Sequence, residues 1–159
     1  MPARLLREHL DQHNIKYVTI GHSLAYTSQE IAASAHIPGS KFAKTVMVTV
    51  DGKMAMAVLP APYKVDLGEL KRVVGGKRIE LATEREFEDR FPGCDAGAMP
   101  PFGNLYGMDV FADDDLATEP DIVFNAGTHQ ELIRMAYSDF ERLVAPKVAR
   151  FCSQALVAA

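Results

Sequence analysis

Three features of the chain could do chemistry, and the first is a lysine in an apolar row. In the expected strand Phe42–Val50, alternation places Lys44 on the same face as Phe42, Val46, Val48 and Val50. Such a lysine either extends its ammonium past the edge of a sheet or lines a cavity whose ligand is an anion or a carbonyl group. The sequence alone leaves both interpretations open.

The second feature is the stiff segment 97–103, which reads Gly-Ala-Met-Pro-Pro-Phe-Gly. Its two prolines fix their own φ and push the preceding residues toward extended conformations. The terminal glycines allow sharp turns and a close approach of a ligand, so the N–H groups of Gly97, Ala98 and Met99 are candidate donors. Considered by itself, a segment rich in glycine and proline is more typical of a tight surface turn, here one that covers the edge of a core with Met99 and Phe102.

The third feature is His129, in a glycine-containing loop between two expected strands, although a lone loop histidine is more often structural. His9 and His13 are four residues apart and could pair on a metal, but without a third ligand a solvated helix face is favoured. The acidic run 113–115 is interpreted as a solvated turn. The sequence contains no P-loop, dinucleotide-binding, zinc-protease or nucleophile-elbow motif, and we expect neither a metal nor a cofactor.

Several strands must position these residues. Two alternating runs flank Asp51-Gly52, the strongest short hairpin signal, and they predict an antiparallel pair that carries Lys44. The other predicted strands are 17–20, 77–81, 106–112, 122–124 and 132–135.

Capping boxes at Thr27, Thr83 and Ser138 predict the starts of three helices, because each hydroxyl can bond an amide three residues later. The predicted helices are 2–13, 28–35, 65–74, 84–91, 139–144 and a C-terminal helix that ends near residue 157. Strands and helices do not follow a strict βαβ order. The pattern therefore predicts an α+β fold in which helices surround a mixed, partly barrel-like sheet.

Length and composition indicate a single domain over residues 1–159. The chain has 48% hydrophobic and 24% charged residues, and no apolar run approaches the roughly 20 residues of a membrane span. The first residues do not form a secretory signal, so we expect a cytoplasmic protein without a membrane partner. The formal net charge of −4 argues against a protein that coats DNA or RNA through its overall field.

Together these features resemble a known family. A Phe-Ala-Lys-Thr-Val run before an Asp-Gly turn, Val65-Asp66-Leu67 at a helix start and a G-x-x-x-P pattern are similar, in order and spacing, to the YbaK/prolyl-tRNA synthetase editing-domain family of aminoacyl-tRNA deacylases. The resemblance covers about residues 3–145. It implies a mixed sheet with surrounding helices and hydrolysis of the ester of mischarged tRNA by water, without a metal or a nucleophilic triad.

The resemblance also implies the site residues. Lys44 and Gly97 match the family's catalytic positions. Lys44 would position the terminal nucleotide or the ester carbonyl, and the amides of residues 97–99 would hold the aminoacyl group where oxyanion charge develops. The residues expected to bind the substrate are Ala98, Met99, Pro100, Pro101, His129, Thr45 and Val46.

Substrate and partners follow as further expectations. A small apolar pocket, lined by Met99 and by the row of Val46 and Val48, implies a small aminoacyl group. Alanine is favoured, and serine, threonine and 2-aminobutyrate are candidates. The expected partners are the acceptor end of mischarged tRNA, with tRNA-Pro as the first candidate, and prolyl-tRNA synthetase or another synthetase. The alternative is a non-catalytic module that binds a synthetase or an RNA end, but such a module has no need of both Lys44 and Gly97.

Overall fold

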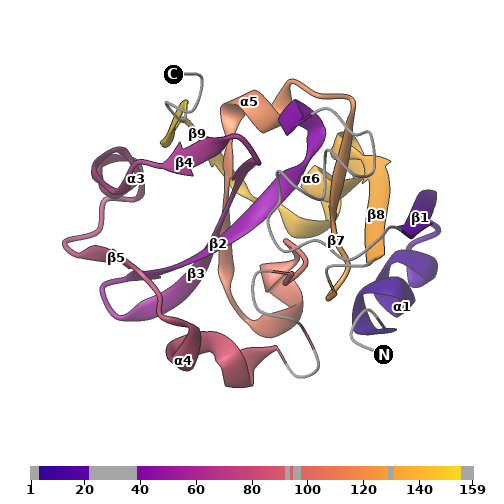
Figure 1. Ribbon diagram of the computed structural model, residues 1–159, viewed down its shortest axis with the longest axis horizontal. Helices are drawn as coiled ribbons and strands as arrows, with labels where there is room; N and C mark the ends of the chain where they lie inside the picture. The colour runs from indigo at the N-terminus through magenta and orange to yellow at the C-terminus, as the bar shows by residue number, and fades with distance from the viewer. Residues whose placement is uncertain (1–3, 22–38, 92–93, 95–97, 129–130, 155–159) are drawn as a thin grey trace.

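A computed structural model of the chain describes residues 4–21, 39–91, 94, 98–128 and 131–154. Its strands form a five-stranded, a three-stranded and a two-stranded sheet, with short helices around them (Figure 1). The strands are β1 (Tyr17–Gly21), β2 (Ala43–Val50), β3 (Lys53–Pro60), β4 (Tyr63–Val65), β5 (Ile79–Leu81), β6 (Asp109–Asp113), β7 (Asp121–Asn125), β8 (Glu131–Ala136), β9 (Lys147–Ala149) and β10 (Cys152–Gln154). The predicted α+β fold is confirmed, and pairing among the described strands closes no barrel.

The five-stranded sheet has the order β5-β2-β3-β6-β9. The first three strands are antiparallel, whereas β6 runs parallel to β3 and β9 runs parallel to β6. The β2–β3 hairpin is the predicted one, because Asp51 and Gly52 take φ values of 52° and 84°, as a type I′ turn requires. The Asp51 carboxylate also accepts the N–H groups of Lys77 and Arg78 at 2.9 and 2.7 Å, which fixes the entry into β5.

The three-stranded sheet has the order β1-β8-β7 and is antiparallel throughout. A single parallel bridge between Phe42 and Val123 joins it to β2. Phe42, Val123, Ala61 and Leu132 form a small apolar group, the bridge cluster.

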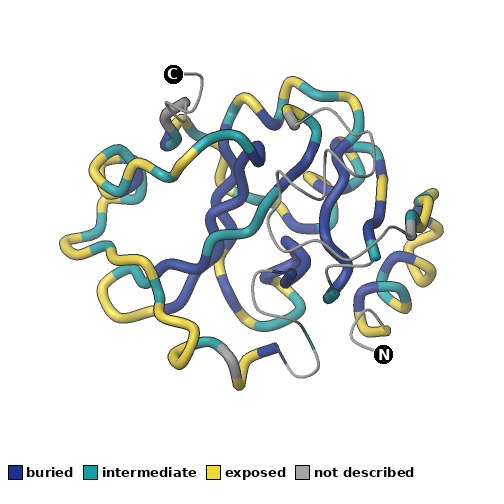
Figure 2. Tube along the Cα trace, viewed as in Figure 1, coloured by how far each residue is buried: buried dark blue, intermediate teal, exposed yellow. Residues whose placement is uncertain are grey.

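Two larger apolar clusters lie on opposite faces of the β2–β3 hairpin. The main core includes Met47 and Met56, and the outer cluster includes Val48 and Phe111. The central strands are therefore buried along most of their length, while exposed residues gather on the peripheral helices and turns (Figure 2). Alternation along β2 consequently decides which cluster each of its side chains faces.

The helices are α1 (Arg4–Gln12), α3 (Leu67–Val74), α4 (Glu84–Phe87), α5 (Asp114–Ala117) and α6 (Tyr137–Val144). The 3₁₀ helices are η1 (Gly39–Lys41), η2 (Glu88–Arg90) and η3 (Gly103–Tyr106). The capping box at Thr83 is confirmed, since its N–H donates to Glu86 Oε1 at 2.8 Å and its Oγ1 accepts from Glu86 N–H at 3.3 Å. The helix that it begins is shorter than predicted and continues as η2.

Two predicted boundaries are wrong for identifiable reasons. The helix predicted from residue 65 begins at Leu67, because β4 pairs with β10 and Asp66 caps the helix by accepting from Glu69 N–H at 3.1 Å. The strand predicted over 106–112 is β6, which is preceded by η3. The left-handed Gly107 ends η3, and the Met108 N–H donates to Gly103 O at 2.9 Å.

The predicted C-terminal helix is also wrong, because β9 and β10 occupy this part of the chain. Ser138 does not cap α6. The helix begins at Tyr137, Ala136 is its N-cap, and no side chain caps it. The capping box at Thr27 and the helix predicted over 28–35 lie outside the described residues. No helix in the described ranges is long and apolar enough to cross a membrane.

Candidate functional site

The edge of β2 that faces away from β3 is only partly covered. Phe42 bridges to Val123 at one end, and residues 48–50 pair with β5 at the other. Lys44, Thr45 and Val46 pair with no described strand on this side, so we call these three residues the open edge. All three are predicted site residues, and a break in sheet pairing leaves backbone groups available to a ligand.

The hairpin register shows which backbone groups face the open edge. Val50 and Lys53 close a two-residue turn, so the even-numbered residues of β2 bond to β3 and the odd-numbered ones point outward. Met47 follows this rule, because its carbonyl accepts the N–H of Ala82 at 2.9 Å. The N–H and C=O of Thr45 therefore point to the open edge.

Lys44 is partly buried and pairs with Leu59 of β3. Its ammonium forms no hydrogen bond or ion pair with any residue that the structure describes. Burial lowers the pKa of Lys44; the nearby Cys152 thiol raises it, and the like charge of Lys64 lowers it further. The result is a partly desolvated cation that has no counterion among the residues described, which suits an anionic or carbonyl ligand.

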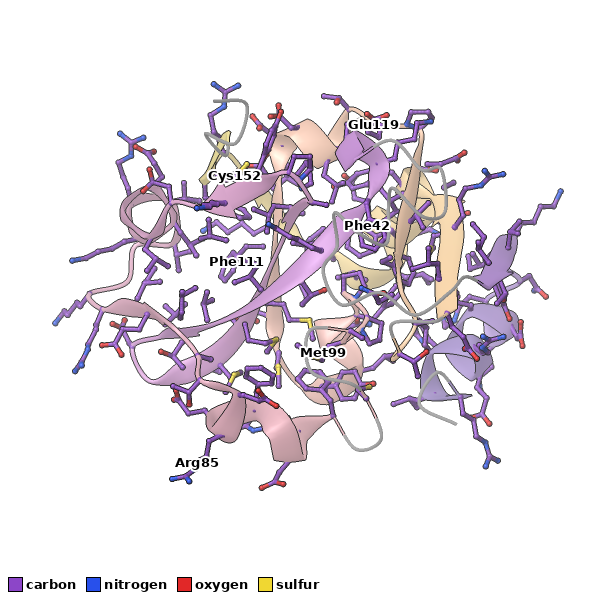
Figure 3. The ribbon with its side chains drawn as sticks, viewed as in Figure 1. Phe42, Arg85, Met99, Phe111, Glu119 and Cys152 are labelled. Carbon is purple, nitrogen blue, oxygen red and sulfur yellow. The ribbon has the colours of Figure 1, made fainter. Side chains whose placement is uncertain are left out.

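The side chains of the open edge alternate between the two faces. Val46 belongs to the outer cluster, and Lys44 shares its face. Thr45 lies on the face of the main core, where its Oγ1 is buried without a hydrogen-bond partner in the described part of the chain. The same separation is visible in Figure 3, where Phe111 and Cys152 lie on one side of the β2 ribbon and Met99 on the other.

The described part of the Gly/Pro-rich segment is buried, so its interpretation as a surface turn is wrong, whereas the expected packing of Met99 and Phe102 on the core is confirmed. Ala98, Met99, Pro100 and Pro101 are all buried. Met99 belongs to the main core and is 4% exposed, so it lies in a different cluster from Val46 and Val48. The structure therefore does not bring Met99 and these valines together on one face. Gly97 and His129 lie outside the described residues.

The buried segment is anchored beside the end of β7. The Ala98 carbonyl accepts the N–H of Gly127 at 3.0 Å. Phe102 packs its ring against those of Phe124 and Phe140, with both centroid distances 5.6 Å. The segment is thus fixed relative to β7, the strand that bridges to β2.

The potential metal ligands do not form a convincing site. The side chain of His13 bonds the carbonyl of His9 at 2.9 Å, and no third ligand joins this pair among the described residues. Among the described residues, Asp113, Asp114 and Asp115 form the only group of three potential metal ligands. The prediction that this run is a solvated turn is wrong for Asp113. It is fully buried, and its two oxygens accept the N–H groups of Phe151 and Asp115, both at 3.1 Å.

Two surface hollows lined by described residues lie away from Lys44. The larger has a volume of about 520 Å³ and lies between β1, β8 and α6. Lys16, Arg134 and Arg142 face Asp121 and Asp139 there, so its charges nearly balance. The smaller lies beside β6 and β9. Neither hollow has the strong charge of one sign that would attract an RNA backbone.

Asn125 is a site candidate that the sequence analysis missed, because the predicted strand ended at residue 124. It is the last residue of β7 and is 4% exposed. Extending the alternation of Ile122, Val123 and Phe124 by one residue would have predicted a buried position.

The fold and geometry agree with comparisons to known proteins. The profile of the aminoacyl-tRNA editing domain matches residues 22–143. The chain belongs to this family. Editing of an aminoacyl-tRNA is the hydrolysis of its ester, so the protein is an aminoacyl-tRNA deacylase and the non-catalytic alternative is not supported.

Individual relatives support the same family. The multifunctional Ser/Thr-tRNA deacylase ProXp-y of Escherichia coli strain K12 is 32% identical over 114 residues, which are 69% of this chain and 68% of that protein. The proline–tRNA ligase of Maridesulfovibrio salexigens is 31% identical over 101 residues, which are 64% of this chain but only 17% of the ligase. A crystal structure of a proposed trans-editing enzyme for prolyl-tRNA synthetase has a TM-score of 0.80 at 23% identity, covering 96% of this chain and 97% of that one, and it supports the fold alone.

Proposed function

We propose that this editing domain removes small amino acids from mischarged tRNA in trans, with alanine favoured and serine, threonine and 2-aminobutyrate also accepted. The ProXp-y relative is named a Ser/Thr-tRNA deacylase, which supports a small aminoacyl group. Matches to proline–tRNA ligases support tRNA-Pro as the carrier and prolyl-tRNA synthetase as a partner. Translation takes place in the cytoplasm, so we propose that location for the protein.

The observation that carries the proposal is the Lys44 cation at the open edge, for which the described part of the chain supplies no counterion. In the proposed complex, the Lys44 ammonium binds the ester carbonyl or the terminal nucleotide of the tRNA. The Thr45 N–H points to the same edge and can donate to the same ligand. Donors that are fixed before the reaction stabilise the developing oxyanion at little reorganisation cost.

The reaction needs only water as its second reactant. Water adds to the ester carbonyl, the bond to the terminal ribose oxygen breaks, and that oxygen takes a proton. The products are a free amino acid and tRNA with a free terminal hydroxyl. We keep Gly97 and His129 in the proposed site on their sequence positions alone, with Gly97 as a donor to the oxyanion and His129 as a substrate contact.

A panel of charged tRNA-Pro tests the proposal. We expect release of alanine to be fastest, release of serine, threonine and 2-aminobutyrate to be measurable, and release of proline to be slow. Because a single methylene group changes binding only modestly, the discrimination between amino acids of similar size should be about 10- to 200-fold. If the enzyme releases none of these amino acids faster than they are released without enzyme, the proposal is rejected.

The lowered pKa of Lys44 predicts a particular pH profile. If catalysis needs the ammonium, activity should decline with rising pH at a value below the ordinary lysine pKa, because burial favours the neutral amine. Removing the like charge in Lys64→Ala should raise the Lys44 pKa and move this decline to higher pH. Enzyme-free ester hydrolysis is subtracted at each pH.

Lys53→Ala is the matched control, since it removes an exposed charge from the hairpin turn at the far end of β2. Its profile should coincide with that of the wild type. A Lys64→Ala profile that also coincides with the wild type would show that the decline does not report on Lys44.

A further inference from the structure

Asn125 carries a buried acceptor to which none of the described residues donates a hydrogen bond. Asp113 and Asn125 are the only buried polar or charged residues among those described, and the oxygens of Asp113 are bonded. Asn125 Oδ1 is buried and has no hydrogen-bond partner in the described ranges. A buried oxygen without a donor is costly to the fold, so the position calls for a ligand that supplies one.

The position of Asn125 relates it to the open edge. The parallel bridge joins Phe42 to Val123, and Lys44 and Asn125 each lie two residues beyond it on their own strands. Alternation places both side chains on the face of the bridge residues. Lys44 has the Cys152 thiol and Lys64 near its ammonium, and no hydrogen bond joins Lys44 to Asn125.

The chain beyond Asn125 continues to the buried Gly/Pro-rich segment. Two residues later, the Gly127 N–H donates to the Ala98 carbonyl at 3.0 Å. Along the chain, Asn125 therefore lies between Val123, which bridges to Phe42, and Gly127, which bonds to Ala98.

The chemistry of an aminoacyl ester narrows the choice of donor. Its α-ammonium has three donors and no acceptor, and an amide oxygen is an acceptor only. The Thr45 hydroxyl at the open edge also has no hydrogen-bond partner among the described residues, but a hydroxyl is both donor and acceptor and is less selective. We propose that the Asn125 carboxamide oxygen accepts a hydrogen bond from the α-ammonium group of the substrate and so orients the ester at the open edge. This inference rests on the proposed function.

The test compares alanyl-tRNA with lactyl-tRNA, in which a hydroxyl replaces the α-ammonium. Asn125→Leu removes the acceptor at similar size, and we expect kcat/KM for alanyl-tRNA to fall by about 10- to 100-fold, the effect of losing a charge-assisted bond. The loss for lactyl-tRNA should be much smaller. Asn125→Asp keeps an acceptor and adds a negative charge, so it should increase the preference for alanyl- over lactyl-tRNA.

Controls separate this role from others. Asn104→Leu removes an exposed amide elsewhere and should change neither substrate. Equal losses of kcat/KM for both substrates in Asn125→Leu, or no loss, would overturn the inference. A change in the ratio of kcat/KM for seryl-tRNA to that for alanyl-tRNA would also overturn it, because it would indicate that Asn125 binds the side-chain hydroxyl of the amino acid. If thermal unfolding shows that Asn125→Leu is not folded, the ratio of kcat/KM for alanyl-tRNA to that for lactyl-tRNA in Asn125→Asp tests the inference instead. A ratio no higher than that of the wild type would overturn it.

A binding measurement keeps the inference separate from the proposed activity. The amide analogue 3′-(alanylamino)-3′-deoxyadenosine retains the α-ammonium but lacks the ester. We expect it to bind the wild type more tightly than Asn125→Leu. An inactive wild-type protein that still shows this difference would reject the proposed function and leave the inference standing, whereas equal binding would overturn the inference.

Discussion

Replacement of Lys44 by methionine is expected to lower kcat for alanyl-tRNA by about 100- to 1000-fold, the range found when one donor to a developing oxyanion is removed. The melting temperature of the variant should not fall below that of the wild type. The Lys44 ammonium has no bonded partner among the described residues, and burial disfavours its charge. Methionine keeps most of the apolar stem that packs on the face of the outer cluster.

Thermal unfolding and single-turnover deacylation together check this prediction. Lys53→Met is the matched control, because the same substitution at an exposed turn should change neither quantity. A fall in melting temperature that accompanies the loss of activity would identify Lys44 as structural. Full activity in Lys44→Met would remove it from the proposed catalytic site.

Asp113→Ala is expected to have the largest effect on stability of the changes considered. The fully buried carboxylate accepts the N–H groups of Phe151 and Asp115. The substitution leaves these donors unpaired and frees the chain that leads into β10. Since bonds to a charged group contribute about 1.5–3 kcal/mol each, we expect a loss of about 3–5 kcal/mol.

Asp114→Ala provides the control for Asp113→Ala. Asp114 is partly exposed, and its carboxylate lies 3.7 Å from Arg150 Nε, so its loss should cost less than about 1 kcal/mol. Denaturant unfolding measures both variants. Similar losses, or a wild-type melting temperature that falls on adding a chelator, would instead indicate that the acidic group holds a cation.

Local signals in the sequence determined several elements correctly. The turn at Asp51-Gly52, the capping box at Thr83 and the stop of α3 at Gly75 depend on residues within about four positions of one another. Their φ angles and hydrogen bonds form inside the segment itself, so no distant partner is needed to predict them. The mixed α+β fold followed from the order of such segments, and the likeness of the motifs to the editing-domain family followed from their spacing.

Tertiary structure decided what depends on a distant partner. The three-residue strands β9 and β10 exist because β6 and β4 supply their hydrogen bonds, and the prediction of a C-terminal helix could not include these partners. Asp113 was assigned to solvent because its neighbours are acidic, yet the N–H of Phe151, 38 residues later, makes it a buried acceptor.

The candidate site divides in the same way. The sequence placed Lys44, Thr45 and Val46 on one strand, since side-chain alternation is local. Only the bridge of Phe42 to Val123, and the pairing of β5 farther along, shows that these residues form an open edge beside Asn125. Pairing between strands far apart in the chain is set by burial in the complete fold, so short-range spacing does not contain it.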